Sequence, residues 1–504
     1  MNIMKKKYII VLVILFSISA CKKQLDTNLS NPNGVTSAQI TAKDVFANAV
    51  QTTSSTITTA YSFANEWMGI WARTTTYSAS SGTEVEDFKL QNSFSYIVAS
   101  SDGLWASQYH NIRDYNFIIS NSAKGSILPG AAMIMKAMVF QDLVDVYGDV
   151  PYTQASNPDL STQPKYDDAA SIYKNLISDI DAGIASVKAS TSTSDDVADK
   201  MFGGNKSKWV RFANTLKLKI LLRQVPNGDQ TFVKSAIANI LSEGSGFLGV
   251  GEDAKFNPGY ADAAGGQSPF WSVYGFQVGG KGNQLGQSFY IANQTMMDNL
   301  STTNDPRIAY LYDTTNGKHN SVYLGTVNTT LAPASMATIG PGLLHSPSDS
   351  AVLMLASQSF FLQAEAAERG LISGNYSALL KTAIEESFRF LNIPNAISAA
   401  DNFYTSSTDS RVNPANSADP IKTIIYQKWV ALAGVDGLET WAEYRRTGYP
   451  DRTNPTVLSG VSAADNVLPK KLLYPQSEYN LNKTNVGAEN QTSTGFKTKI
   501  FWGL

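Results

Sequence analysis

The sequence predicts a mainly α-helical protein, in which TPR-like helical hairpins form a scaffold with long loops and a few short strands. Apolar side chains recur at three- and four-residue spacing through most of the chain, which is the period of an amphipathic helix. Two such segments, 351–370 and 375–393, are separated by a short turn. Together they make a hairpin of about 40 residues, close in size to a tetratricopeptide (TPR) unit. Strict repeat consensus is absent, so the units are described as TPR-like.

Four further helices are expected in the first half of the chain, at 102–119, 130–152, 166–187 and 206–225. Gly148 and Pro151 should end the second of these near Tyr147, and Asp167 or Asp168 should cap the third. Residues 244–347 are rich in glycine and aromatics, with few helix signals and several short strand candidates. Four tryptophans lie on helical stripes and are expected in the core: Trp105, Trp209, Trp429 and Trp441.

The N-terminus has the features of a lipoprotein signal peptide at residues 1–20. Lys5–Lys7 precede an apolar run, Tyr8–Ala20, which is shorter than the roughly 20 apolar residues that a spanning helix needs. The sequence ISAC then matches the bacterial lipobox, in which cleavage precedes an acylated cysteine. Cys21 is therefore expected to be a lipidated first residue, and 21–40 a tether. The alternative is a plain secreted protein with an incidental cysteine.

Net charge, cysteine count and length limit the kinds of partner and of fold that this chain can have. Removal of residues 1–20 takes three lysines and no acid from 40 basic and 42 acidic residues, which leaves 37 against 42, or a net charge of −5. This mildly acidic balance argues against nucleic acid as a partner. Because Cys21 is the sole cysteine, the mature chain has no internal disulfide and depends on a large buried core. Length alone suggests about three domains.

Three acidic residues lie in or near the sequence DVYGDVPY: Asp142, Asp145 and Asp149. Such oxygens could hold a structural calcium ion. The favoured interpretation is a turn, in which Gly148 ends the helix and Asp149 hydrogen-bonds local backbone. The three histidines are far apart in sequence and lack metal-binding spacing, so no cofactor is expected.

Two further charged segments are interpreted as structural. The helix at 206–225 has six basic residues and no acid: Lys206, Lys208, Arg211, Lys217, Lys219 and Arg223. We expect these side chains on a solvated face, with an anionic partner or phospholipid headgroups as the alternative. In ETWAEYRRTGYP, Glu439 and Glu443 have a spacing that also suits acid–base catalysis in a glycosidase. Structural ion pairs with Arg445 and Arg446 are the favoured interpretation.

Aromatic residues in polar, loop-like segments are the candidate binding residues. Residues 61–88 and 268–284 hold Trp, Tyr and Phe among glycines, serines and amides. An indole or phenol ring packs against the apolar face of a sugar, while arginine and amide groups bind the hydroxyls at its rim. The expected ligand platform is Trp71, Tyr77, Trp271 and Tyr274, with Arg73 and Asn283 as polar helpers. The alternative is that each ring only fixes its own loop to the scaffold.

An ordered set of motifs spans nearly the whole mature chain. After Cys21 the set is DVYGDVPY (145–152), KWVRFANTLKLKILLR (208–223), DPR (305–307), FFLQAEAAERG (360–370), QKWVALAGVDGLETWAEYRRTGYP (427–450) and LLYPQSEYNLN (472–482). In this order the motifs resemble the SusD/RagB family of nutrient-binding outer-membrane lipoproteins, and within it the SusD-like branch.

The resemblance implies a non-catalytic, lipid-anchored receptor at the outer membrane. It would capture an oligosaccharide or, less favoured, a peptide, and pass it to a SusC-like TonB-dependent transporter in the same membrane. It also implies one binding domain at 41–504 with TPR-like units, in place of three domains. Ligand-contact positions vary within the family, so no site residue is carried over. A surface glycosidase or peptidase, and a structural or adhesive lipoprotein, are the alternative functions.

Overall fold

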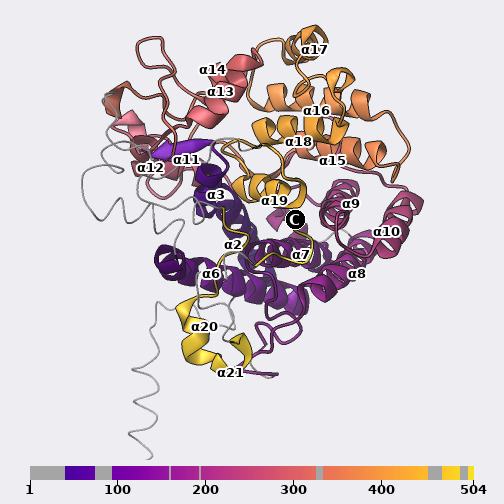
Figure 1. The fold of residues 1–504 in the computed structure, drawn as a ribbon. Coiled ribbons are helices and arrows are strands. Elements are labelled where there is room, and N and C mark those ends of the chain that lie inside the picture. The colour runs from indigo at the N-terminus through magenta and orange to yellow at the C-terminus, as the bar shows by residue number, and fades with distance from the viewer. Residues whose placement is uncertain are drawn as a thin grey trace, which may run out of the picture.

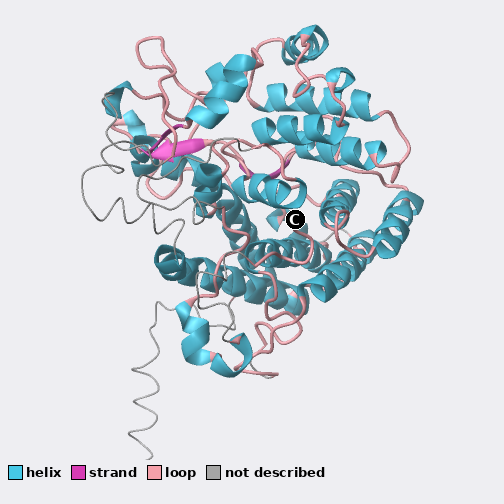
Figure 2. Cartoon of the chain, in the orientation of Figure 1, coloured by secondary structure: helices cyan, strands magenta, loops and turns pink. Residues whose placement is uncertain are grey.

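The computed structural model describes residues 40–73, 94–157, 160–191, 194–324, 333–451, 468–487 and 498–504, which are mostly helical (Figures 1 and 2). The predicted class is confirmed, because helices form the scaffold and the strands are short. The signal peptide, Cys21 and all of the tether except Ile40 lie outside the described residues. Within the described ranges, no helix is long and apolar enough to cross a membrane.

The first half of the chain forms a run of helices in which sequence neighbours pack together (Figure 1). Their bounds are α2 Ala42–Ser55, α3 Ser62–Trp67, α6 Phe94–Asn121, α7 Leu128–Tyr147, α8 Ala169–Ala189, α9 Lys206–Arg223 and α10 Gln230–Glu243. Asp168, Asn205 and Asp229 each accept a hydrogen bond from a backbone N–H three residues on, which caps α8, α9 and α10. Helix α7 ends where Gly148 takes a φ of 84°, so both boundaries predicted here are confirmed.

The predicted helical hairpin is formed by α15 (Ala356–Glu368) and α16 (Tyr376–Phe390), which pack side by side. Gly370, with a φ of 67°, follows the end of α15 as expected. The first residues of the expected helix, Ala351–Met354, form strand β4 instead. The remaining helices of this part are α17 Ala396–Ser406, α18 Pro420–Ala431, α19 Gly437–Thr447, α20 Gln476–Leu481 and α21 Lys483–Val486.

Residues 244–347 contain short helices more often than the strands expected there. The helices are α11 Pro269–Tyr274, α12 Leu285–Phe289, α13 Gln294–Thr302 and α14 Ile308–Leu311. These helices are too brief to show the 3.6-residue period clearly, because each makes fewer than three full turns. In Figure 1, α11 and α12 lie to the left of α3 and α13 and α14 lie above it, while α15–α18 lie to its upper right.

Two short antiparallel pairs of strands join distant parts of the chain. Strand β1 (Trp71–Arg73) pairs with β3 (Tyr290–Ala292), and β2 (Ala254–Phe256) pairs with β4 (Ala351–Met354). The first pair fastens the loop-rich segment to the end of α3. The second brings the start of that segment beside the helical hairpin.

One hydrophobic cluster runs through the described residues from Ala42 to Trp502. The four tryptophans expected in the core are all buried, which confirms that prediction. Edge-on aromatic contacts are frequent in this cluster. One example is Trp441 of α19, whose ring centroid lies 5.1 Å from that of Trp67 in α3.

The expectation of a solvated basic face on α9 is wrong for its C-terminal half. Lys217, Lys219 and Arg223 are buried, because α7, α8, α10 and α15 all pack on this helix. Arg223 donates to Glu439 and, at 2.9 Å, to Glu443, and the Lys219 Nζ lies 3.2 Å from Glu439. Two of the acids that pair with this half of α9 therefore come from α19, more than 200 residues further along the chain, whereas Lys217 pairs with Asp181 of α8.

The prediction that Glu439 and Glu443 form ion pairs is confirmed, but of the two expected arginines only Arg446 takes part, through Glu443. Glu439 also accepts from Lys428 at 2.6 Å, and Arg446 pairs with Glu443 and with Glu365 of α15. Burial alone would raise the pKa of Glu439, but Arg223, Lys219 and Lys428 hold that pKa well below its ordinary value. Arg445 differs from expectation: it stacks on Trp441 and donates to backbone carbonyls, at 2.6 Å for Asp145.

The sequence DVYGDVPY forms the predicted turn. Asp149 accepts a backbone hydrogen bond as expected, but from a distant residue. Its Oδ1 accepts from the N–H of Ala169, at the start of α8, at 2.9 Å. Asp145 instead accepts from Tyr173 and lies 3.3 Å from Arg223. In the described part of the chain, no three His, Cys, Asp or Glu side chains are placed to hold a metal ion.

Candidate functional site

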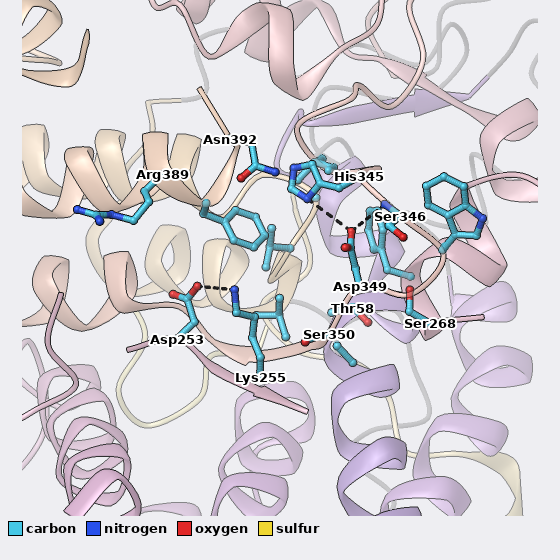
Figure 3. Close-up of a pocket in the computed structure, with 18 of the residues that line it drawn as sticks. Thr58, Asp253, Lys255, Ser268, His345, Ser346, Asp349, Ser350, Arg389 and Asn392 are labelled. Carbon is cyan, nitrogen blue, oxygen red and sulfur yellow. Dashed lines mark hydrogen bonds and ion pairs between the residues drawn. The ribbon is translucent and has the colours of Figure 1, made fainter. Parts of the chain in front are cut away.

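A cavity of about 410 Å³ lies where the loop-rich segment meets the α15–α16 hairpin (Figure 3). Its walls come from α11, the end of α16, strands β2 and β4, the π-helical turn at Thr56–Ala60, and the loops at 343–350 and 434–435. We call it the α11–α16 pocket. Pockets formed between structural units and lined by both apolar and polar groups are common ligand sites.

Three aromatic side chains line the α11–α16 pocket: Phe270, Trp271 and Phe390. Trp271 is partly exposed, and its Nε1 donates to the carbonyl oxygen of Phe276 at 3.0 Å. Its ring also meets the Phe276 ring edge-on, with centroids 5.6 Å apart. The indole is therefore fixed by its own loop while it forms part of the pocket wall.

The loop at 343–350 supplies a carboxylate to the pocket. The Oδ2 of Asp349 accepts from the Ser346 N–H at 3.0 Å and lies 3.5 Å from the Nδ1 of His345 (Figure 3). The Asp349 side chain is 40% exposed. The Ser268 N–H donates to the carbonyl of Pro347 at 2.8 Å, which ties this loop to the start of α11.

Two ion pairs lie elsewhere in the pocket wall. The Lys255 Nζ is 2.8 Å from Asp253, and the Arg389 Nε is 3.1 Å from Glu386. Each acid also accepts a backbone N–H, at 2.7 and 2.8 Å. The Lys255 ammonium lies 5.7 Å from the centroid of Phe390, within cation–π range. These charges are largely balanced within the protein, so they define the shape and polarity of the wall.

Trp71 and Tyr274, two residues of the expected platform, are each 1% exposed. The ring of Tyr274 lies 5.0 Å from that of Trp71 and 4.8 Å from that of Phe270. Burial raises the pKa of the Tyr274 hydroxyl well above its ordinary value. A ring without a free face cannot stack on a sugar, so these two residues form a layer that supports the pocket wall. This matches the alternative considered from the sequence.

The other predicted residues are placed apart from one another. Trp271 lines the pocket, whereas Arg73 is buried with its Nε 3.0 Å from Glu66. Asn283 is exposed, pairs with Phe276 in an isolated β-bridge and is not part of the pocket wall. Tyr77 lies outside the described residues.

Sequence reasoning missed Phe390, Asp349 and Arg389. Phe390 and Arg389 fell within an expected helix, and their position at its open end follows from how α16 packs. The segment 340–350, GPGLLHSPSDS, did offer a signal, because a loop rich in glycine, proline and serine that also contains an acid and a histidine is typical of an exposed binding loop.

The fold is a helical scaffold, and the α11–α16 pocket places aromatic rings beside fixed polar groups, as ligand-binding proteins do. The chain belongs to the SusD-like family. The family model, described as "Starch-binding associating with outer membrane", matches residues 32–475. This confirms the resemblance to SusD/RagB proteins noted in the sequence, and such proteins have a nutrient-binding role.

Solved structures support the same fold. A chitin-binding SusD homologue from Flavobacterium johnsoniae matches 92% of this chain and 98% of its own, with a TM-score of 0.71 and 20% identity. Another structure, described as a chitin-binding protein, has a TM-score of 0.70 and 21% identity over 91% of this chain and 100% of its own. A SusD homologue from Bacteroides vulgatus has a TM-score of 0.69 and 20% identity, over 89% and 92% of the two chains. No curated protein matches significantly by sequence.

Proposed function

We propose that this protein is a lipid-anchored outer-membrane receptor that binds an oligosaccharide and delivers it unchanged to a SusC-like TonB-dependent transporter. The observation that supports binding is the α11–α16 pocket, where aromatic rings stand beside fixed polar groups. The starch-binding description of the family, together with the chitin-binding relatives, favours glycan over peptide.

The pocket fits the chemistry of a sugar. A volume of about 410 Å³ suits a small ligand. The C–H face of a sugar ring would pack on Trp271, and its hydroxyls would meet Asp349, Ser346 and Arg389 around the rim. No bond needs to form or break for this role.

Calorimetric titration of the mature protein with neutral oligosaccharides and with peptides tests the binding function. We expect saturable binding of a glycan. A flat response to both panels would favour a structural or adhesive role. Turnover of a labelled glycan or peptide by the purified protein would favour an enzyme.

The anchor and the transporter are tested separately. Mass spectrometry of the wild-type N-terminus should find an acylated Cys21, and Cys21→Ala should move the protein out of the membrane fraction. An unmodified N-terminus would contradict the anchor. Purification from native outer membranes should bring down a large β-barrel with a plug domain, and recovery of the receptor without a barrel would contradict the delivery role.

A further inference from the structure

We propose that the ligand of the α11–α16 pocket carries a primary ammonium group, as an oligosaccharide of free amino sugars does, and that Asp349 binds this group. The inference rests on the proposed glycan-binding function and specifies the class of sugar. It follows from the charges of the pocket wall, from the orientation of Asp349 and from the rings around it.

The charges of the wall are unequal in one respect. Three carboxylates line the pocket: Asp253, Asp349 and Glu386. Asp253 and Glu386 each have a lysine or an arginine within 3.1 Å. Of the described residues, only His345 lies within ion-pair distance of Asp349. Asp349 is therefore the one carboxylate of the three that has no permanently charged partner. A cationic group of the ligand would supply that partner.

The orientation of Asp349 leaves a position for such a group. Ser346 and His345 both approach the same oxygen, Oδ2. Oδ1 accepts no hydrogen bond from any residue that the structure describes, and the side chain is 40% exposed. Figure 3 shows the Lys255–Asp253 pair on a different side of the pocket from Asp349. Lys255 therefore does not occupy the position beside Asp349 where the ammonium group of a ligand would bind.

The aromatic rings of the pocket wall favour the same ligand. The ring of His345 meets that of Phe390 edge-on at 6.5 Å, and the loop that holds Asp349 is hydrogen-bonded to the start of α11, the helix of Trp271. Ring faces attract cations, and a carboxylate makes a charge-assisted hydrogen bond to an ammonium. An acetylated amine offers one neutral N–H in place of the charge, so it would gain less at this position.

The test compares two β-1,4-linked oligosaccharides of equal length, one of glucosamine and one of N-acetylglucosamine, by calorimetry. The titrations are run in low salt at about pH 5.5, because the amino groups of glucosamine oligosaccharides are less basic than a lysine side chain and keep their protons only at mildly acid pH, where an ordinary aspartate is still ionised. We expect the amine form to bind about tenfold tighter, as for one charge-assisted hydrogen bond. Added salt should reduce the difference.

Asp349→Asn is the decisive variant, because asparagine keeps an oxygen for the Ser346 N–H but has no charge. It should bind the two oligosaccharides with equal affinity. His345→Gln should keep the preference for the amine form, because it leaves the carboxylate in place. Asp313→Asn is the matched control, since Asp313 is exposed and outside the pocket wall, and it should behave as wild type.

Equal binding of the two forms by wild type, or a preference that survives Asp349→Asn, would overturn the proposal and leave the receptor function standing. If an amine-bearing peptide binds and neither glycan does, the assignment to sugars is wrong. If neutral glycans, amino sugars and peptides all fail to bind, it is the proposed function itself that is refuted.

Discussion

Replacement of Trp271 by alanine should weaken ligand binding while the fold persists. The indole is partly exposed on the short helix α11, and its one hydrogen bond is made to Phe276, within the same loop. Loss of that bond costs about 1 kcal/mol of unfolding free energy. Loss of a central aromatic contact to the ligand costs about 2 kcal/mol, or roughly 30-fold in Kd.

Trp71→Ala is the informative comparison, because Trp71 belongs to the layer beneath the pocket. Its ring is 1% exposed and packs against Tyr274 and Tyr290, each at 5.0 Å. Truncation there should cost about 3–5 kcal/mol of unfolding free energy, as for other buried aromatics. The two variants therefore distinguish Trp271, which is expected to contact the ligand, from Trp71, which supports the pocket wall from beneath.

The assay pairs calorimetric titration of a bound glycan with thermal and urea unfolding of the same preparations. Trp271→Phe should recover part of the affinity, since a ring remains available for stacking. If Trp271→Ala binds as tightly as wild type and unfolds as readily as Trp71→Ala, then Trp271 is a structural residue and the pocket wall has been misassigned.

Two further predictions concern the buried charges. Glu439→Gln should lower the unfolding free energy by about 3–5 kcal/mol, because it leaves Arg223, Lys219 and Lys428 short of a partner in the interior. The half-exposed Lys381–Asp401 pair is the control, and Asp401→Asn should cost less than about 1 kcal/mol in urea unfolding. Burial raises the pKa of Asp142 well above its ordinary value, more than Lys219 lowers it. Because the folded protein holds the Asp142 proton more tightly than the unfolded chain does, protonation of Asp142 favours the folded state. This stabilisation is fully present below about pH 3.9, the pKa of an unfolded aspartate, and is lost as pH rises through the raised pKa of the folded protein. Asp142→Asn should therefore raise the melting temperature at about pH 7, with a gain that shrinks towards about pH 4; a loss at every pH would contradict this sign.

Much of the fold could be predicted from the sequence because its determinants are local. The 3.6-residue period shows where the long helices lie. Gly148 then marks the end of α7, and Asp168 marks the start of α8. Strand β4 was missed because its apolar residues run directly into α15, and a short apolar run does not distinguish strand from helix. The burial of Lys219 was missed because its acidic partner, Glu439, is brought there by the tertiary fold.

The site was less predictable, because exposure is a property of packing. Trp71 and Trp271 stand in similar polar sequences, yet the pairing of β1 with β3 buries the first, and α11 leaves the second in the pocket wall. Composition could suggest that loop aromatics bind a ligand. It could not show that Phe390, at the end of a scaffold helix, would line the same pocket.

The buried charges also bear on the glycosidase alternative, which began from the spacing of Glu439 and Glu443. A catalytic acid must reach the glycosidic oxygen and must keep its proton near neutral pH, which requires a raised pKa. Glu439 and Glu443 are 1% and 3% exposed, and cations hold the pKa of Glu439 far below its ordinary value. These carboxylates therefore fasten α19 to α9 and α18. Their loss should appear as a lower unfolding free energy, while the affinity of each folded molecule for its ligand stays unchanged.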